Sequence, residues 1–368
     1  MTPTSPQFET GNGTFLANGG HREKRLTLTK LTSLKTVISG LLFAFGAAMC
    51  APTFSSASVS TALFNGPDGI TVSGRYVWVT DLNSNEVTEL NASNGSLVKI
   101  INASPYKFNE PSAISADGDR VWVVNDGLYG SGVTELNASN GSLVRVINSS
   151  ADGLRGSTSI SVNGSHVWVA NLLSVTELNA SNGSLVRVIN ASAANELSPS
   201  AITVSDGRVW VLNLGGSVTE LNASNGSLVK VVKVYASDLA AQYGIVASGG
   251  HVWVSTDGLT DVGVTELDAS NGSLVRIINA SADELGSPWA VTVSGGHVWA
   301  ADFNSGGITE LNATNGSLVR VVNSRSTSQF GTPFDIVVSG GHVWATYVNG
   351  NAVAEFNASN GSFVRVVK

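Results

Sequence analysis

The sequence predicts an all-β, seven-bladed β-propeller with four antiparallel strands in each blade. A segment of the type Val-Thr-Glu-Leu-Asn-Ala-Ser-Asn-Gly-Ser-Leu-Val-Arg recurs along the chain. Its glycine falls at Gly95, Gly141, Gly183, Gly226, Gly272, Gly316 and Gly361, a step of 42 to 46 residues. A tryptophan segment and a run of small, β-branched residues precede each copy. A repeat of this length with four strand-like segments is typical of a propeller blade.

The first segment of each repeat is predicted to be the innermost strand. It consists of small and β-branched residues, such as Ile70-Thr71-Val72 in the first repeat and Ile202-Thr203-Val204 in the fourth. β-branched residues favour strands, and small side chains fit the crowded centre of a ring. A glycine turn such as Ser73-Gly74 then leads outward.

The second predicted strand carries one tryptophan in a Val-Trp-Val or Val-Trp-Ala context. The seven residues are Trp78, Trp122, Trp168, Trp210, Trp253, Trp299 and Trp344. Large aromatic side chains repeated once per blade are expected to pack between neighbouring blades. Two residues before each tryptophan stands a large hydrogen-bonding side chain: Tyr76, Arg120, His166, Arg208, His251, His297 and His342.

The third and fourth strands form a hairpin around an Asn-Gly turn, where glycine supplies the positive φ that a tight turn requires. Glu89 precedes Lys99 by ten residues, and every repeat has a Glu with Arg or Lys at this spacing. The spacing predicts cross-strand ion pairs, each worth about 0–1 kcal/mol if exposed. Two alternatives are a set of carboxylates lining a site and N-glycosylation at the Asn-x-Ser triplets of the turn.

The chain before the first blade predicts export. Residues 1–57 combine a polar, basic region with the apolar run Val37–Met49, the pattern of a secretory signal with cleavage after Ala57. The run is shorter than the roughly 20 residues of a membrane span. Cys50 follows it as in a bacterial lipoprotein, although Met49 departs from that pattern. We therefore expect a secreted, periplasmic or cell-surface protein, with membrane attachment only if this segment stays uncleaved or is lipidated at Cys50.

The predicted propeller domain comprises residues 58–368. Its blades are expected at residues 65–104, 109–150, 157–192, 199–235, 242–281, 288–324 and 333–368. The 368-residue chain has a net charge of −7, and loss of residues 1–57 leaves about −10, from 15 Lys and Arg against 25 Asp and Glu. An acidic domain without a basic patch argues against binding nucleic acid. We expect a monomer.

A first candidate site lies three residues after each tryptophan, where Asp and Asn prevail. The position holds Asp81, Asn125, Asn171, Asn213, Thr256, Asp302 and Tyr347. Such oxygens at a channel mouth suit a hard cation such as Ca²⁺, and no other cofactor is predicted. Alternatively, these side chains cap the turn that leaves the strand.

A second candidate site lies where the chain enters each innermost strand, next to a proline in five blades. The position holds Asp68, Ser112, Thr158, Ser200, Tyr243, Trp289 and Phe334. The first four are polar and the last three aromatic, so Tyr243, Trp289 and Phe334, with Asp68, are the predicted ligand-binding residues. Aromatic rings on one side of a channel mouth can stack on a sugar or planar ligand. Alternatively, they plug the channel.

The Val-Trp-Val and Val-Thr-Glu-Leu-Asn-Ala-Ser-Asn-Gly-Ser segments resemble those of secreted bacterial propellers of the YVTN or NHL-repeat type, over residues 64–368. They are more loosely similar to the virginiamycin B lyase-like and quinoprotein propellers. This resemblance implies the propeller fold and leaves the activity open. The His and Glu of the lyase family would be expected on the loop face that varies between the repeats. This chain has no His there. It has no Gly-x-Ser-x-Gly or His-Glu-x-x-His motif and no vicinal cysteines, so no catalytic residue is predicted.

Because copies of one loop face vary while those of the other are nearly identical, the variable face is the expected binding surface. The favoured function is a non-enzymatic scaffold that binds a protein or glycan partner. The alternatives are a Ca²⁺-dependent hydrolase or lactonase, as in the six-bladed gluconolactonase-type propellers, and a structural protein of the cell envelope.

Overall fold

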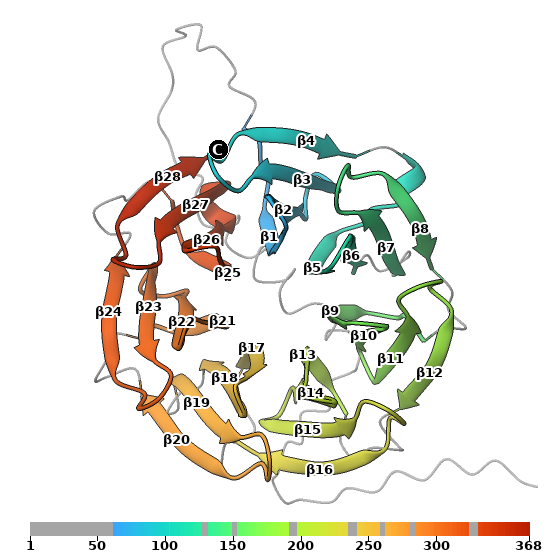
Figure 1. Ribbon diagram of the computed structural model, residues 1–368, viewed down its shortest axis with the longest axis vertical. Helices are drawn as coiled ribbons and strands as arrows, with labels where there is room; N and C mark the ends of the chain where they lie inside the picture. The colour runs from blue at the N-terminus through green and yellow to red at the C-terminus, as the bar shows by residue number, and fades with distance from the viewer. Residues whose placement is uncertain are drawn as a thin grey trace, which may run out of the picture.

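The computed structural model describes residues 62–102, 104–126, 132–148, 153–190, 197–234, 241–257, 262–279, 285–323 and 330–368. They form seven four-stranded antiparallel sheets arranged in a ring (Figure 1). The predicted fold class is confirmed. The predicted signal segment, residues 1–57, lies outside the described residues. No helix within the described residues is long and apolar enough to cross a membrane.

Strand order in each sheet follows chain order from the central channel to the rim. The innermost strands are β1 (Pro67–Ser73), β5 (Pro111–Asp117), β9 (Ser157–Asn163), β13 (Pro199–Ser205), β17 (Ala241–Ser248), β21 (Pro288–Ser294) and β25 (Pro333–Ser339). The second strands, which carry the tryptophans, are β2 (Tyr76–Asp81), β6 (Arg120–Asn125), β10 (His166–Asn171), β14 (Arg208–Asn213), β18 (His251–Asp257), β22 (His297–Asp302) and β26 (His342–Tyr347).

The third strands carry the Glu residues. They are β3 (Glu86–Asn91), β7 (Gly132–Asn137), β11 (Ser174–Asn179), β15 (Ser217–Asn222), β19 (Gly263–Asp268), β23 (Gly307–Asn312) and β27 (Ala352–Asn357). The outer strands are β4 (Leu97–Ile101), β8 (Leu143–Ile147), β12 (Leu185–Asn190), β16 (Leu228–Lys233), β20 (Leu274–Asn279), β24 (Leu318–Asn323) and β28 (Phe363–Val367). Two 3₁₀ turns, η3 (Ser104–Tyr106) and η6 (Val348–Gly350), complete the described elements.

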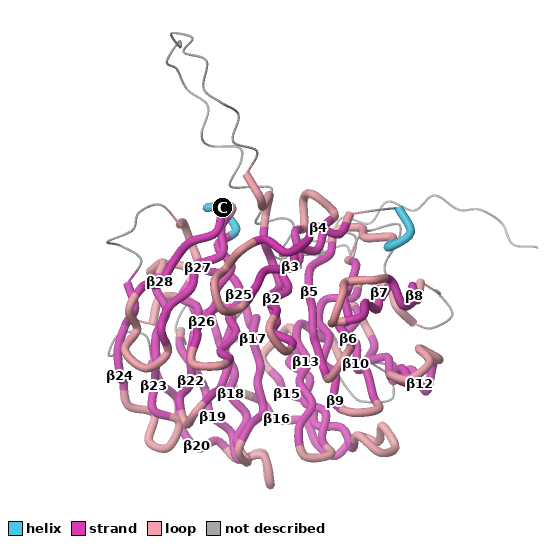
Figure 2. The backbone as a smooth tube through the Cα atoms, turned by 45° about the horizontal axis from the view of Figure 1, so that its top comes forward, coloured by secondary structure: helices cyan, strands magenta, loops and turns pink. Residues whose placement is uncertain are grey.

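The short turns gather on one face of the ring, at the lower edge of Figure 2. We call it the turn face, because it carries the glycine turns after the innermost strands and the Asn-Gly turns before the outer strands. The C-terminus lies on the opposite face, which we call the variable face. The chain enters every innermost strand from the variable face, so residues near the start of those strands lie close to that end of the channel.

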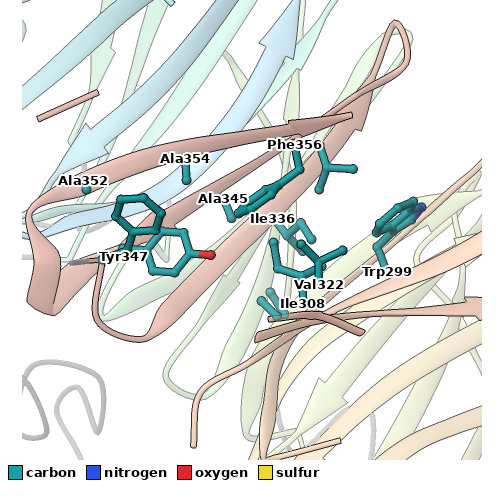
Figure 3. Packing of buried hydrophobic residues seen from close by; sticks show 13 residues of the cluster. Trp299, Ile308, Val322, Ile336, Ala345, Tyr347, Ala352, Ala354 and Phe356 are labelled. Atoms are coloured by element: carbon teal, nitrogen blue, oxygen red, sulfur yellow. The ribbon is translucent and has the colours of Figure 1, made fainter. Parts of the chain in front are cut away.

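The hydrophobic core lies between blades. Each tryptophan is almost fully buried and belongs to a cluster with residues of the next blade around the ring. Trp299 of β22, for example, lies near Ile336 and Ala345 of the seventh blade (Figure 3). The predicted inter-blade packing of the tryptophans is confirmed. Burial of such large aromatic surfaces is the main contribution that holds neighbouring blades together.

The predicted Glu and Arg or Lys partners do face each other across the third and outer strands, but the Glu side chains are buried. Glu177 lies between two partners, with His166 Nδ1 2.6 Å from Oε1 and Arg187 Nε 2.7 Å from Oε2. Its side chain is 0% exposed. An exposed pair would contribute about 0–1 kcal/mol, whereas removing one partner of a buried pair costs about 3–5 kcal/mol. In blades two to seven, the Arg or His two residues before the tryptophan thus supplies a second partner for this carboxylate.

The outer-strand arginines also connect neighbouring blades. Arg187 Nη2 donates to the carbonyl of Ser224, which lies in the Asn-Gly turn of the next blade, at 3.2 Å. Arg145 donates in the same way to Ser181, at 3.1 Å. An arginine therefore joins the buried Glu of its own blade to the turn of the following one, so the repeated turn contributes to packing between blades.

The ring closes by packing, because all four strands of each blade come from one continuous repeat. Phe64, 1% exposed, clusters with Trp344 of the seventh blade. Across the same seam, Thr346 Oγ1 donates to the Asp68 carbonyl at 2.7 Å, and the Ile70 N–H donates to Asp335 Oδ2 at 3.0 Å. The segment before the first blade therefore covers the junction between blades seven and one.

Candidate functional site

Each innermost strand contains a β-bulge near its start. In β13, Pro199 pairs with Asn213 and Ala201 pairs with Leu212, so Ser200 is the extra residue. The same shift occurs in the other six innermost strands. Bulges bend a strand and re-aim its side chains. The variable position after the proline therefore coincides with the one irregular point of each inner strand.

Three of the bulges are held by a hydroxyl group of the second strand. The N–H groups of Gly69, Gly244 and Asp335 donate to Thr80, Ser255 and Thr346, at 2.8, 2.9 and 3.0 Å. The corresponding second-strand residues in the other four blades are apolar: Val124, Ala170, Leu212 and Ala301. The bulges of blades one, five and seven are thus fixed differently from the rest.

The bulges surround a cavity of about 300 Å³ in the channel. Most of its lining residues come from the first half of the innermost strands, so it lies toward the variable face. The cavity is asymmetric. Blades two to four contribute a hydroxyl sector, made of Ser112, Ser115, Thr158, Ser159 and Ser200. Blades six, seven and one contribute an aromatic and acidic sector, made of Trp289, Phe334, Asp335 and Asp68.

Two of the predicted aromatic residues meet in the second sector. The Trp289 ring stacks on Phe303 with 3.9 Å between centroids and meets Phe334 edge-on at 5.0 Å. Trp289 is only 5% exposed, so one of its faces packs within the protein. The side chain of Tyr243 lies outside the described part of the chain. Phe303 was not predicted, although it is the only aromatic residue at its position, directly after Asp302, among the seven repeats.

The two carboxylates of the sector lie on neighbouring strands, β1 and β25. Asp68, predicted from the sequence, is almost fully buried. Asp335, which was not predicted, is half-buried and accepts from the backbone N–H groups of Ile70 and Ile336, at 3.0 and 2.8 Å. These two hydrogen bonds hold the Asp335 carboxylate beside the cavity, because hydrogen bonds to a carboxylate are stronger than those between neutral groups.

The predicted metal-binding side chains do not line this cavity. Asp81, Asn125, Asn171, Asn213 and Asp302 are buried inside their own blades, and several accept from the backbone of the incoming loop. The Asn65 N–H donates to Asp81 at 2.6 Å and the Ser198 N–H to Asn213 at 3.1 Å. Burial raises the pKa of Asp81 to about 6 and that of Asp302 to about 7.

Several of these side chains thus tie the incoming loop to the second strand, and four of them also bond a threonine hydroxyl of the third strand: Asn125, Asn171, Asn213 and Asp302. Asn171 Nδ2, for example, donates to Thr176 Oγ1 at 3.0 Å. Within the described residues, no group of three or more His, Cys, Asp and Glu side chains is placed to hold a metal ion.

No family model and no curated protein matches this chain. Among solved structures, hydrazine synthase from Kuenenia stuttgartiensis aligns with a TM-score of 0.65 and 15% identity, covering 83% of this chain and 99% of that one. The Pan2 WD40 domain of Neurospora crassa aligns at 0.62 and 11% identity, covering 78% and 87%. A computationally designed protein, Ika8, aligns at 0.61 and 12% identity, covering 83% and 88%. Identities this low show a shared β-propeller fold only.

Proposed function

We propose that this β-propeller is a non-enzymatic binding scaffold, which holds a partner at its variable face and receives part of that partner in the channel cavity. The observation that supports this function is the asymmetry of the cavity. The tryptophans, buried Glu residues and turns repeat around the ring, whereas the residues at the bulges differ from blade to blade. Differences gathered along the lining of one cavity are expected where a ligand is recognised.

Of the two partner types that the sequence suggested, the lining favours a glycan. Aromatic rings opposite several hydroxyl groups suit a ligand that has both apolar ring faces and hydroxyl groups, as a sugar has. A volume of about 300 Å³ lies at the small end of ligand sites and would accept one terminal sugar. A Ca²⁺-dependent hydrolase would need the Asp and Asn set at the channel mouth, and the hydrogen bonds of that set within the blades favour the scaffold.

Secretion is part of this proposal. It rests on the basic stretch and apolar run within residues 1–57, and mass spectrometry of the native N-terminus tests it. A start at Ser58 agrees with export and cleavage, whereas a lipid on Cys50 would indicate a membrane-anchored scaffold. Retention of the whole segment in the mature protein would contradict cleavage after Ala57.

A glycan array probed with the purified protein tests the binding function, followed by titration of each hit. We expect Trp289→Ala to weaken binding at least about fivefold, since loss of one stacked aromatic removes about 1 kcal/mol or more. Val98→Ser, on the exposed rim, is the matched control and should leave binding and melting temperature unchanged. An array without hits, or equal losses in both variants, would refute binding at the cavity.

A further inference from the structure

The hydroxyl groups that line the cavity differ in whether the protein already uses them. Ser115 and Ser159 each accept from a backbone N–H of the next innermost strand, at 3.3 Å. Thr158 and Ser200 donate to carbonyl oxygens of their own second strands, at 3.5 and 3.1 Å. Ser112 is the exception. It is 4% exposed, and its Oγ has no hydrogen-bond partner among the described residues.

Ser112 can be compared directly with Ser200, because both are the extra residue of the bulge in their innermost strands. The Ser200 hydroxyl donates to the carbonyl of Leu212, the second-strand residue that pairs next to the bulge. Val124 has the same place in blade two, but the Ser112 hydroxyl does not bond to it. A bulge of this kind can therefore satisfy a serine hydroxyl within its own blade, and Ser112 departs from that arrangement.

The backbone of Ser112 is closely packed against the preceding blade. A Cβ on Gly69 of β1 would lie 2.9 Å from the Ser112 carbonyl oxygen, so the glycine is what allows β1 to approach this bulge. The blades before Thr158 and Ser200 have residues with side chains at the position of Gly69. Among these three hydroxyl residues, Ser112 alone has a glycine against its bulge, which holds its backbone at the edge of the cavity.

A buried hydroxyl without a partner destabilises a folded protein, and such groups are rare. They are expected at binding sites, where a ligand supplies the missing hydrogen bond and where activity is kept at the expense of stability. Ser112 lines the cavity, and a serine hydroxyl can both donate and accept. A hydroxyl group on a ligand has the same two capacities, so the two groups can pair in either direction.

We propose that Ser112 is the specificity-determining residue of the cavity and that its hydroxyl binds one hydroxyl group of a sugar. This inference rests on the proposed binding function and specifies how the site selects its ligand. A sugar that lacks this hydroxyl group leaves Ser112 unpaired in the complex, so it should bind more weakly. The other hydroxyl residues of the sector contribute less to selection, because bonds within the folded protein already orient them: Ser115, Thr158, Ser159 and Ser200.

Thermal unfolding of the full-length protein tests the unpaired hydroxyl without a ligand. Ser112→Ala removes a buried polar group that has no partner, so the melting temperature should rise by about 1–3 °C. Ser200→Ala is the matched control at the same position of blade four. It removes the hydrogen bond to the Leu212 carbonyl and should lower the melting temperature. A melting temperature of Ser112→Ala equal to or below that of the wild type would overturn the inference.

Calorimetric titration tests the selection itself. The probes are the methyl glycosides of glucose, galactose and mannose, together with the monodeoxy derivatives of each. For a glycoside that binds, we expect one deoxy derivative to bind the wild type about five- to tenfold more weakly than its parent. Ser112→Ala should bind that derivative and the parent equally, because the pair that distinguished them is gone. Ser200→Ala should keep the full difference.

The outcomes separate this inference from the proposed function. If deoxy derivatives lose the same factor in the wild type and in Ser112→Ala, the role of Ser112 is refuted, while weaker binding by Trp289→Ala still supports the scaffold. If Ser200→Ala also abolishes the difference, selection belongs to the whole hydroxyl sector and not to Ser112. If the glycan array gives hits but no glycoside binds, the Ser112 proposal is overturned. If the array is blank as well, both proposals fail.

Discussion

Asp302 is predicted to destabilise the folded protein at neutral and alkaline pH, and Asp302→Asn should relieve this. Blades two, three and four have Asn at the same position, so the substitution follows the chain's own pattern. Asp302 is 0% exposed and accepts from Thr309 Oγ1 at 2.5 Å. In the fourth blade, Asn213 Nδ2 donates to Thr219 Oγ1 at 2.9 Å, so an amide can satisfy the same neighbour.

The size of the stability gain expected for Asp302→Asn follows from the pKa of Asp302. Burial raises the pKa of Asp302 from its ordinary value of 3.8 to about 7, a gap of about 3 units. Each unit corresponds to about 1.4 kcal/mol, which sets an upper limit of about 4 kcal/mol for the cost of ionising this group in the folded state. Allowing for relaxation around a buried charge, we expect Asp302→Asn to raise the free energy of unfolding by about 1–3 kcal/mol at pH 8.

The contribution of Asp302 to the free energy of unfolding should change with pH in one direction only. Between pH 4 and 7 the folded protein holds a proton on Asp302 that the unfolded chain has lost, so this group's contribution to stability falls as pH rises. Above pH 7 both states are ionised and the penalty is constant. Asn does not titrate, so the advantage of Asp302→Asn should be near zero at pH 4, grow up to pH 7 and then level off.

Urea unfolding at pH 4.5, 6 and 8 measures this advantage. Asp81→Asn is the matched variant, because the pKa of Asp81 is raised only to about 6; its gain should be smaller and complete at lower pH. Equal gains at all three pH values would mean that the carboxylate charge is not the cause. A loss of stability in Asp302→Asn at pH 8 would refute the reasoning outright.

Two further predictions concern the joints between blades. Gly183→Ala should destabilise the protein by about 1–3 kcal/mol more than Gly74→Ala in urea unfolding. Both glycines have a positive φ, so the backbone cost is shared. A Cβ on Gly183 would lie 2.6 Å from Arg145 Cδ, whereas a Cβ on Gly74 would meet open space. Equal losses would show that only the backbone matters. Phe64→Ala should lower the free energy of unfolding by about 3–5 kcal/mol, because Phe64 packs against Trp344 at the seam between blades seven and one. Amide hydrogen exchange should become faster in β1 and β28 than in β13. A uniform increase in exchange over all blades would contradict this.

The fold was predictable because the features that define a blade repeat in the sequence. One tryptophan per unit indicated packing between blades, and Asn-Gly indicated the hairpin. The burial of Glu177 was not predictable from its spacing to Arg187. It depends on how the outer strand and the next blade's turn cover the carboxylate, which is a tertiary effect.

The site was predictable only in part. The variable position at the start of each inner strand marked Asp68, Trp289 and Phe334, and all three line the cavity. Asp335 was missed because the bulge lets two successive residues face the channel, and the sequence does not show a bulge. Phe303 was missed because it reaches Trp289 from the turn after β22, a different part of the blade.

Because the ring closes without a strand shared between blades one and seven, any loop between blades is an equivalent starting point for the chain. No strand has to return from one terminus to complete a sheet begun at the other, so new ends opened in any loop between blades should leave seven intact sheets. In-frame duplication or loss of one repeat likewise adds or removes a whole blade and never half of one. Such a chain can have grown by copying a single unit, and the nearly identical Asn-Gly hairpins are what recent copying would leave behind.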